Sequence, residues 1–210
     1  MSEIQLDSTE EKIKDTARDL FLEKGLRGTT IREVAEKAGV NVALVNYYFR
    51  TKNKLFIAIF KEKFLTFNEA GYHILTNEEK PFLERIDDFI DHYIELTLEQ
   101  PNLPIFILSE LHFNDELKEV LASIKSQTKD KYIGILQKNI DEEVAKGKMR
   151  AVNYMKLEIS MMAMMTFPFL TRKMITRVEG MSEETFKVFV LDWKEHIKSM
   201  ILTFLKPEIP

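Results

Sequence analysis

Apolar residues recur at spacings of three and four along most of the chain, and no segment alternates apolar and polar residues as a half-buried strand does. The first helix has its apolar stripe at Ile13, Ala17, Leu20 and Phe21. Ser8 followed by Glu11 is a capping-box pattern that predicts the start of this helix, and Gly25 predicts its end. The chain has only seven glycines and six prolines, so an all-α protein is expected.

Three more helices are expected in the first third of the chain. Thr30 and Glu33 form a second capping box, and Gly39 ends the helix that follows them. A short helix is expected at 42–49, and Thr51 is the expected N-cap of a long fourth helix. Four helices thus occupy the first third of the sequence.

The polar segment TNEEKP after Leu75 marks a boundary between this part and the remainder. A helix that starts near Phe82 should end before Pro101 and Pro104, and further helices are expected at 114–146, 153–176 and 182–206. Pro168 should kink the helix that contains it, because proline removes a backbone hydrogen bond.

Charge is distributed unevenly along the chain. The net charge of the 210 residues is −4, yet the segment from Lys24 to Lys54 holds seven basic and only two acidic residues. Residues 55–210 hold twenty basic and twenty-five acidic residues. A local excess of five positive charges attracts phosphate, so the total charge does not argue against a nucleic-acid partner.

The chain has features of a cytoplasmic protein. It contains no cysteine, so it can form neither a disulfide nor a cysteine-rich zinc site. Its N-terminus has no secretory pattern, and its longest uncharged stretch is the thirteen residues from Ile159 to Thr171. A membrane-spanning helix needs about twenty apolar residues, so no membrane partner is expected.

The second and third expected helices carry, in order, a small residue, a glycine at the turn and two apolar residues that can pack into a neighbouring helix. Ala35, Gly39, Val40 and Val45 are the residue types that two helices crossing at a tight turn require. The segment TTIREVAEKAGVNVALVNYYFRTKNKL resembles the N-terminal domain of the tetracycline-repressor (TetR) family of regulators over residues 9–60. The residues that fit the family pattern are Thr30, Ala35, Ala38, Gly39, Val40, Tyr48, Phe49, Lys52 and Leu55.

This resemblance implies a helix-turn-helix DNA-binding domain at 1–54 and a helical effector-binding and dimerisation domain at 55–210. It places Val42, Ala43, Leu44, Asn46 and Tyr47 on the side of the third helix that faces the DNA groove. Arg32 is expected to reach a base or a phosphate, and Thr30, Tyr48, Lys52 and Lys54 are expected to contact phosphates. Most relatives have Tyr where this chain has Asn46, which suggests a different preferred operator, because Asn can bond adenine through two atoms.

The C-terminal segment is rich in methionine, with seven of the ten methionines between Met155 and Met181. Such a cluster suits an adaptable apolar cavity, although a helix core filled with methionine is an equally good interpretation. The candidate ligand-binding residues are Phe89, Tyr93, Phe106, Met161, Met165 and Phe169. The resemblance further implies that the last two helices form a homodimer interface, for which the candidates are Phe186, Phe189, Trp193, Ile197 and Ile201.

No enzymatic or metal-binding signature is present in the sequence. The four histidines are scattered at 73, 92, 112 and 196, and the common cofactor and metalloprotease motifs are missing. We therefore expect a non-enzymatic, ligand-responsive transcriptional regulator without a cofactor, namely a repressor that a hydrophobic small molecule releases from a palindromic double-stranded operator. An activator with the same fold remains open, and the alternative is a helical small-molecule-binding or scaffold protein without specific DNA binding.

Overall fold

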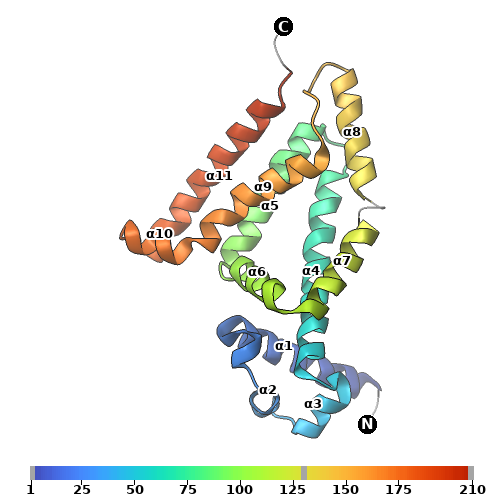
Figure 1. The fold of residues 1–210 in the computed structure, drawn as a ribbon, viewed down its shortest axis with the longest axis vertical. Coiled ribbons are helices and arrows are strands. Elements are labelled where there is room, and N and C mark those ends of the chain that lie inside the picture. Colours follow the sequence, from blue (N-terminus) through green and yellow to red (C-terminus); the bar gives the residue numbers. More distant parts are fainter. Residues whose placement is uncertain (1–2, 129–131, 208–210) are drawn as a thin grey trace. The chain divides into compact units, whose positions relative to one another are not determined.

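The computed structural model describes residues 3–128 and 132–207, and helices are the only regular elements in these two ranges (Figure 1). The described residues divide into two compact units, which are considered separately. The first contains residues 1–66 and 106–122, and the second contains residues 67–105 and 123–210. Within the described ranges, no helix combines the length and apolar composition that a membrane crossing needs.

The first unit is built on helices α1 (Glu3–Gly28), α2 (Ile31–Lys37), α3 (Val42–Phe49) and the first part of α4 (Lys52–Leu75). The α1 stripe predicted from the sequence is buried, and the Phe21 ring meets the Phe56 ring edge to face at 5.3 Å. Gly25 interrupts α1 with a φ of 71°, as its position predicts. The predicted start is wrong, because α1 begins at Glu3 and Ser8 lies inside the helix.

The turn between α2 and α3 has the hydrogen bonds of a glycine-terminated helix. Gly39 has a φ of 64°, its N–H donates to the carbonyl of Glu36 at 3.1 Å, and the Val40 N–H donates to the carbonyl of Ala35 at 2.9 Å. A residue with a Cβ is strained at such a φ, which explains the glycine. The turn therefore forms where the sequence predicts it.

The first unit also contains a helical corner that the sequence did not reveal, at residues 106–122 of α6 (Leu103–Phe113) and α7 (Asp115–Thr128). The Glu110 carboxylate accepts a hydrogen bond from the backbone N–H of Leu26 at 3.2 Å. The Arg27 guanidinium lies over the Phe113 ring at 4.7 Å. This unit is therefore larger than the predicted domain at 1–54, whose boundary stays a prediction about function.

The second unit is formed by α5 (Phe82–Glu99), α8 (Gly134–Ala145), α9 (Tyr154–Leu170), α10 (Arg172–Val178) and α11 (Glu183–Leu205), with the remaining parts of α4, α6 and α7. Helices α5, α9 and α11 pack against one another around a continuous apolar core (Figure 1). The predicted ends of α5 and α11 agree with the structure within one or two residues.

Two of the predicted long helices are divided. The helix expected at 114–146 is α7 and α8, with residues 129–131 outside the described part. The helix expected at 153–176 is α9 and α10, separated at Thr171, which has the non-helical φ of −99° and ψ of 7°. Helices α8 and α9 contribute buried residues to the core of the second unit, whereas α10 has no buried residue among those described.

Pro168 lies inside α9, and its consequence is a bond to another helix. Proline has no N–H, so the carbonyl of Met164, four residues earlier, lacks its helical donor. The Trp193 indole N–H of α11 donates to this carbonyl at 3.0 Å. The Met164 carbonyl that Pro168 leaves without a helical donor thus connects α9 to α11, and α9 continues for two residues beyond the proline.

Candidate functional site

Helix α3 has one buried face and one exposed face. Val45 and Phe49 are buried, whereas Tyr47 is 73% exposed. The remaining exposed positions are Val42, Ala43 and Asn46, and Leu44 and Tyr48 are half-buried. All the residues predicted to face a DNA groove therefore have side chains at the surface of α3 or at its edge.

Side-chain caps define the starts of both helices of the motif. The Thr30 hydroxyl accepts a hydrogen bond from the Glu33 N–H at 3.2 Å at the start of α2. The Asn41 amide oxygen accepts one from the Leu44 N–H at 2.7 Å at the start of α3. Each cap satisfies a backbone donor that the helix leaves free, and so stabilises the start of α2 or of α3.

Three basic side chains of this segment are engaged inside the unit. Lys24 forms an ion pair with Glu33, and its ammonium group holds the pKa of that carboxyl below the ordinary value. Arg27 lies over an aromatic ring, as described above. Lys52, predicted to contact phosphate, donates from Nζ to the Thr29 carbonyl at 2.7 Å.

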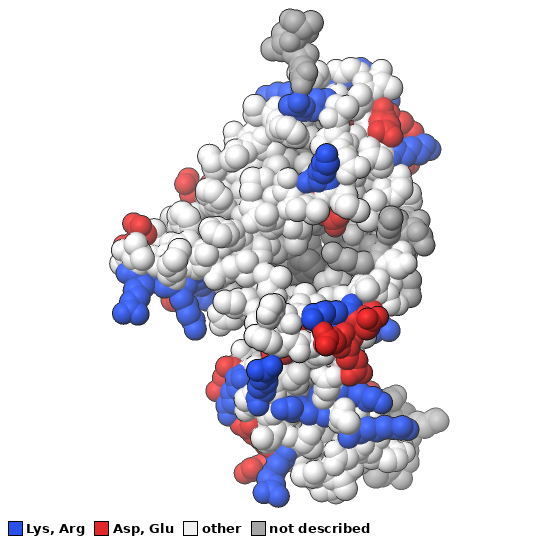
Figure 2. All heavy atoms as spheres, in the orientation of Figure 1, with Lys and Arg blue, Asp and Glu red and all other residues white. Residues whose placement is uncertain are grey.

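Four basic side chains of the segment remain available. Within the described residues, they have neither a hydrogen bond nor an ion pair from the side chain, and all are exposed; they are Arg32, Lys37, Arg50 and Lys54. Figure 2 shows Lys and Arg side chains over one face of the unit that contains α1–α3. We call the first unit the head, and these four residues the free cations of the head.

Thr29 is the point at which three parts of the head meet. It is fully buried, and its hydroxyl donates to the carbonyls of Leu20 at 3.2 Å and Gly25 at 3.0 Å. Its own carbonyl accepts from Lys52 at the start of α4. Lys52 therefore has a structural bond that sequence reasoning missed, because no sequence pattern reports a tertiary bond to a backbone carbonyl.

Five of the six predicted ligand-binding residues lie in the core of the second unit. They are Phe89, Tyr93, Met161, Met165 and Phe169. The Tyr93 hydroxyl oxygen lies 2.7 Å from the Thr166 hydroxyl oxygen, and burial raises the Tyr93 pKa. The sixth residue, Phe106, belongs to the first unit and packs edge to face on Phe56 at 5.6 Å.

The same core contains a polar cluster that the sequence analysis did not identify. The Tyr72 ring stacks on the Tyr132 ring at 4.6 Å, and the Tyr72 hydroxyl donates to the Glu158 carboxylate at 3.4 Å. Burial, together with the nearby carboxylate charge, raises the pKa of Tyr72 and of Tyr154. Tyr72 belongs to α4, Tyr132 lies just before α8, and Tyr154 and Glu158 belong to α9, so their proximity depends on tertiary packing alone.

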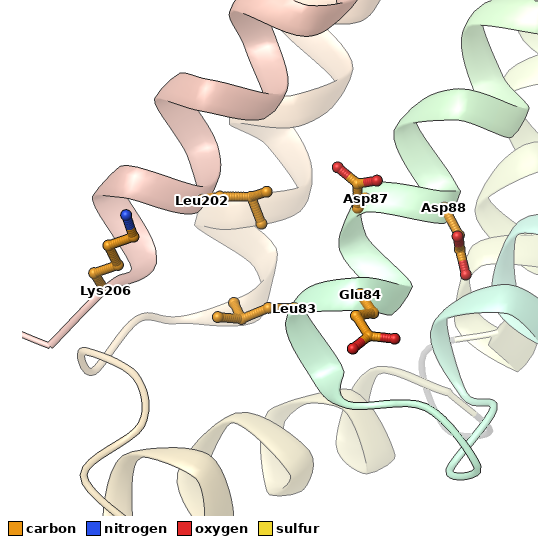
Figure 3. A pocket seen from close by; sticks show the side chains of 6 residues that line it. All are labelled: Leu83, Glu84, Asp87, Asp88, Leu202 and Lys206. Atoms are coloured by element: carbon orange, nitrogen blue, oxygen red, sulfur yellow. The ribbon is translucent and has the colours of Figure 1, made fainter.

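A hollow of about 450 Å³ lies on the second unit between α5 and α11 (Figure 3). None of the predicted ligand-binding residues lines this hollow, and its walls are Leu83, Glu84, Asp87, Asp88, Leu202 and Lys206. Asp87 accepts from Lys198 at 2.9 Å and Asp88 accepts from Lys80 at 2.6 Å. The walls of the hollow therefore combine two leucines with four charged residues, of which Asp87 and Asp88 are ion-paired.

Asp91 joins α5 to α11 through two lysines. Lys194 lies 2.7 Å from one of its carboxylate oxygens and Lys198 lies 2.7 Å from the other. Burial raises the Asp91 pKa, but the hydrogen bonds from Lys194 and Lys198 outweigh this, so the pKa lies below its ordinary value. The three neighbouring aspartates of α5, Asp87, Asp88 and Asp91, are thus all ion-paired.

The predicted dimer residues lie at two different depths. Phe186, Ile197 and Ile201 are buried within the protomer and contribute to its own core. Phe189 and Trp193 are half-buried and stacked on each other at 6.4 Å, and Met200 on the same side of α11 is exposed. Of the predicted interface residues, Phe189 and Trp193 are thus the ones that keep exposed surface on the protomer.

Comparisons with known proteins agree with this geometry. Residues 13–59 match the family described as bacterial regulatory proteins, tetR family. The chain is 26% identical over 205 residues to the probable HTH-type transcriptional regulator YttP of Bacillus subtilis, covering 93% of this chain and 95% of the relative. It is 27% identical over 153 residues to the HTH-type transcriptional repressor NicS of Pseudomonas putida, covering 70% and 68%.

The fold matches a solved structure over nearly its whole length. The transcriptional regulator FadR from Bacillus subtilis, solved in complex with stearoyl-CoA, has a TM-score of 0.69 and 19% identity, covering 92% of this chain and 98% of that one. These matches disfavour a helical scaffold without DNA binding. Residues 13–59 thus match the tetR family of bacterial regulatory proteins, and from this match and its relatives the chain is a ligand-responsive, DNA-binding transcriptional regulator.

Proposed function

We propose that the protein is a cytoplasmic, homodimeric repressor that binds a palindromic operator through α3 and leaves it when a hydrophobic small molecule binds. The observation that carries the proposal is the exposed face of α3 in a head that also has four free cations. Base edges are read from the groove and phosphates set the register, so the two features have complementary roles.

Within this proposal, the α3 residues read bases and the basic residues hold the backbone. Asn46 bonds adenine, Tyr47 and Arg32 reach base edges or the adjoining phosphates, and Val42, Ala43 and Leu44 offer apolar contact to thymine methyl groups. Thr30, Tyr48 and Lys54 contact phosphates. The Thr30 hydroxyl can do so while it caps α2, because a hydroxyl accepts and donates at the same time.

Selection of bound duplexes from a random library tests DNA recognition directly. We expect a two-fold symmetric motif, because a two-fold symmetric dimer presents two identical α3 helices. Asn46→Ala should lose the preference at one base pair in each half-site and retain the rest. An unchanged motif would contradict the role of Asn46, and failure to enrich any duplex would contradict the DNA-binding proposal itself.

The dimer interface is proposed on neighbouring faces of α9 and α11. The exposed side of α9 carries Ile159, Ser160, Ala163 and Phe167, of which Ile159 is 62% exposed, and none of these is charged. The half-buried Phe189 and Trp193 of α11 lie beside it, since Trp193 bonds the α9 backbone. Apart from the exposed Lys156 at the start of α9, these two neighbouring faces carry no charge, which supports a four-helix contact between two copies of the chain.

Sedimentation or light scattering of surface variants tests this interface. Ile159→Glu should shift the protein from dimer to monomer, because the dimer interface would bury the new carboxylate without a charged partner. Val188→Glu is a matched control, because Val188 of α11 is 66% exposed and lies on the side of that helix away from Ile197 and the core. A dimeric Ile159→Glu variant, or a monomeric Val188→Glu variant, would place the interface elsewhere.

A hydrophobic effector is supported by the methionine and aromatic side chains around Met161 and Met165 in the second unit. The stearoyl-CoA bound to FadR, a protein of the same fold, supports a ligand with a long apolar chain. Helices α4, α6 and α7 have residues in both units and provide a covalent route from this core to the head. The effector must bind the DNA-free state more tightly in order to release the operator.

Titration of the protein–duplex complex with stearoyl-CoA tests this part of the proposal. We expect stearoyl-CoA to weaken duplex binding and coenzyme A without the acyl chain to leave it unchanged, because an apolar pocket recognises the chain. An equal response to both compounds, or no response to either, would contradict recognition of this apolar chain.

A further inference from the structure

The turn between α3 and α4 has an unusual backbone. Arg50 has a φ of 61° and a ψ of −49°, and the Thr51 N–H donates to the carbonyl of Phe49 at 2.6 Å. A hydrogen bond between residues i and i+2 with these dihedral angles is the strained form of the γ-turn. Among the described residues, Arg50 is the one residue other than glycine with a positive φ.

The residues around Arg50 fix this turn from both sides. Phe49 is buried in the head, and the Thr51 hydroxyl accepts from the Lys54 N–H at 3.2 Å to cap α4. Lys52 is bonded to the Thr29 carbonyl. Glycine has no Cβ and adopts the positive-φ turn and its mirror image equally well, so the backbone alone favours glycine here. Arginine at this position needs a different explanation.

The Arg50 side chain indicates what that explanation is. It is exposed and is one of the free cations of the head, at the end of the helix whose exposed face is proposed to read bases. A guanidinium binds a phosphate through two parallel hydrogen bonds, and a fixed backbone lowers the entropy lost when it does so. The strained turn directs a phosphate-binding group that an unstrained glycine could not provide.

We propose that Arg50 is a further DNA-backbone contact, whose direction is set by the γ-turn that separates α3 from α4. This inference rests on the proposed DNA-binding function and adds a positioning residue to it. Since a phosphate contact carries no sequence information, Arg50 should set affinity and register without changing the preferred bases.

Three substitutions separate the charge of Arg50 from its backbone. Arg50→Ala removes the guanidinium and keeps the Cβ, Arg50→Gly removes both, and Arg50→Lys keeps a positive charge. Lys61→Ala is the matched control, because Lys61 is an exposed lysine of α4 in the same unit, nine residues beyond the start of the helix. The probe is the fluorescein-labelled duplex selected with the wild-type protein, titrated at several salt concentrations.

We expect Arg50→Ala and Arg50→Gly each to raise the Kd by about tenfold or more, because each variant loses a charge-assisted hydrogen bond in each half-site. The slope of log Kd against log salt should fall by about 0.9 for every phosphate contact removed. Arg50→Lys should recover most of the slope and only part of the affinity, and Lys61→Ala should change neither. Wild-type Kd and slope in the Gly and Ala variants would overturn the proposal.

Thermal unfolding without DNA tests the strained turn separately. At an ordinary position alanine is more stabilising than glycine, but here Arg50→Gly should melt about 2–4 °C above Arg50→Ala. The opposite order would overturn the role of the turn. If the wild-type protein binds no duplex, both this inference and the proposed function fail. If the wild-type protein binds the duplex and the Arg50 variants bind it equally well, this inference alone fails.

Discussion

Replacing Lys52 with methionine should destabilise the protein more than it changes the electrostatics of DNA binding. Methionine keeps the apolar stem of the side chain and removes the ammonium group that bonds the Thr29 carbonyl at 2.7 Å. Thr29 is fully buried, so its carbonyl would be left without this donor and away from water. The sequence-based interpretation of Lys52 as a phosphate contact predicts the opposite balance.

The size of the effect follows from the bond that is lost. A hydrogen bond with one charged partner contributes about 1.5–3 kcal/mol, and because Lys52 is only half-buried the lower part of that range applies. For a chain of this length, a loss of about 1.5–2 kcal/mol lowers the Tm by roughly 3–8 °C. The salt dependence of duplex binding should stay within error of the wild-type slope.

Lys54→Met is the matched comparison, because Lys54 is exposed two residues further along α4 and is one of the free cations. It should leave the Tm unchanged and reduce the salt slope by about 0.9 per contact. Differential scanning calorimetry and fluorescence anisotropy measure the two quantities. A wild-type Tm together with a reduced salt slope in Lys52→Met would refute the structural role of this residue.

Two further predictions concern the second unit. Gly71→Ala should lower the Tm by about 2–6 °C, because the new Cβ would lie 2.8 Å from the Phe89 ring. Gly134→Ala, whose new Cβ would have nothing within 4 Å, should leave the Tm unchanged or raise it slightly. Equal melting temperatures of the two variants would contradict the close packing of α4 on α5. Asp91→Asn should lower the Tm at pH 7, where the carboxylate with its lowered pKa stabilises the fold. The difference from wild type should begin to shrink below about pH 4, the ordinary aspartate pKa, and should disappear once the pH falls below the lowered native pKa. A difference that persists in stronger acid would contradict the ionic origin.

The head was predictable from sequence because local signals define it. The caps at Thr30 and Thr51 and the glycine at position 39 act over three or four residues, and the structure contains each of them. Helix α6 was missed because a local signal in the sequence was misleading. Pro101 and Pro104 suggested a break, yet proline is tolerated in the first turn of a helix, and Pro104 occupies that place in α6.

Tertiary partners could not be predicted in the same way. The stripe from Phe186 to Ile201 correctly indicated burial, but periodicity does not say whether the partner is another helix of the same chain or a second copy. Phe106 was placed with the ligand-binding residues because it is apolar and was expected to point inward, and its contact is with Phe56 of the head. Both cases required knowledge of which helices pack together.

The corner at residues 106–122 has a practical consequence for protein engineering. A modular regulator invites chimeras in which one DNA-reading head is joined to a different sensor at a cut near residue 54. Here such a cut would leave the Leu26 N–H without the carboxylate of Glu110 and the Arg27 guanidinium without the Phe113 ring. A transplantable head from this protein is therefore discontinuous in sequence, and a graft needs both pieces in order to keep its native surface.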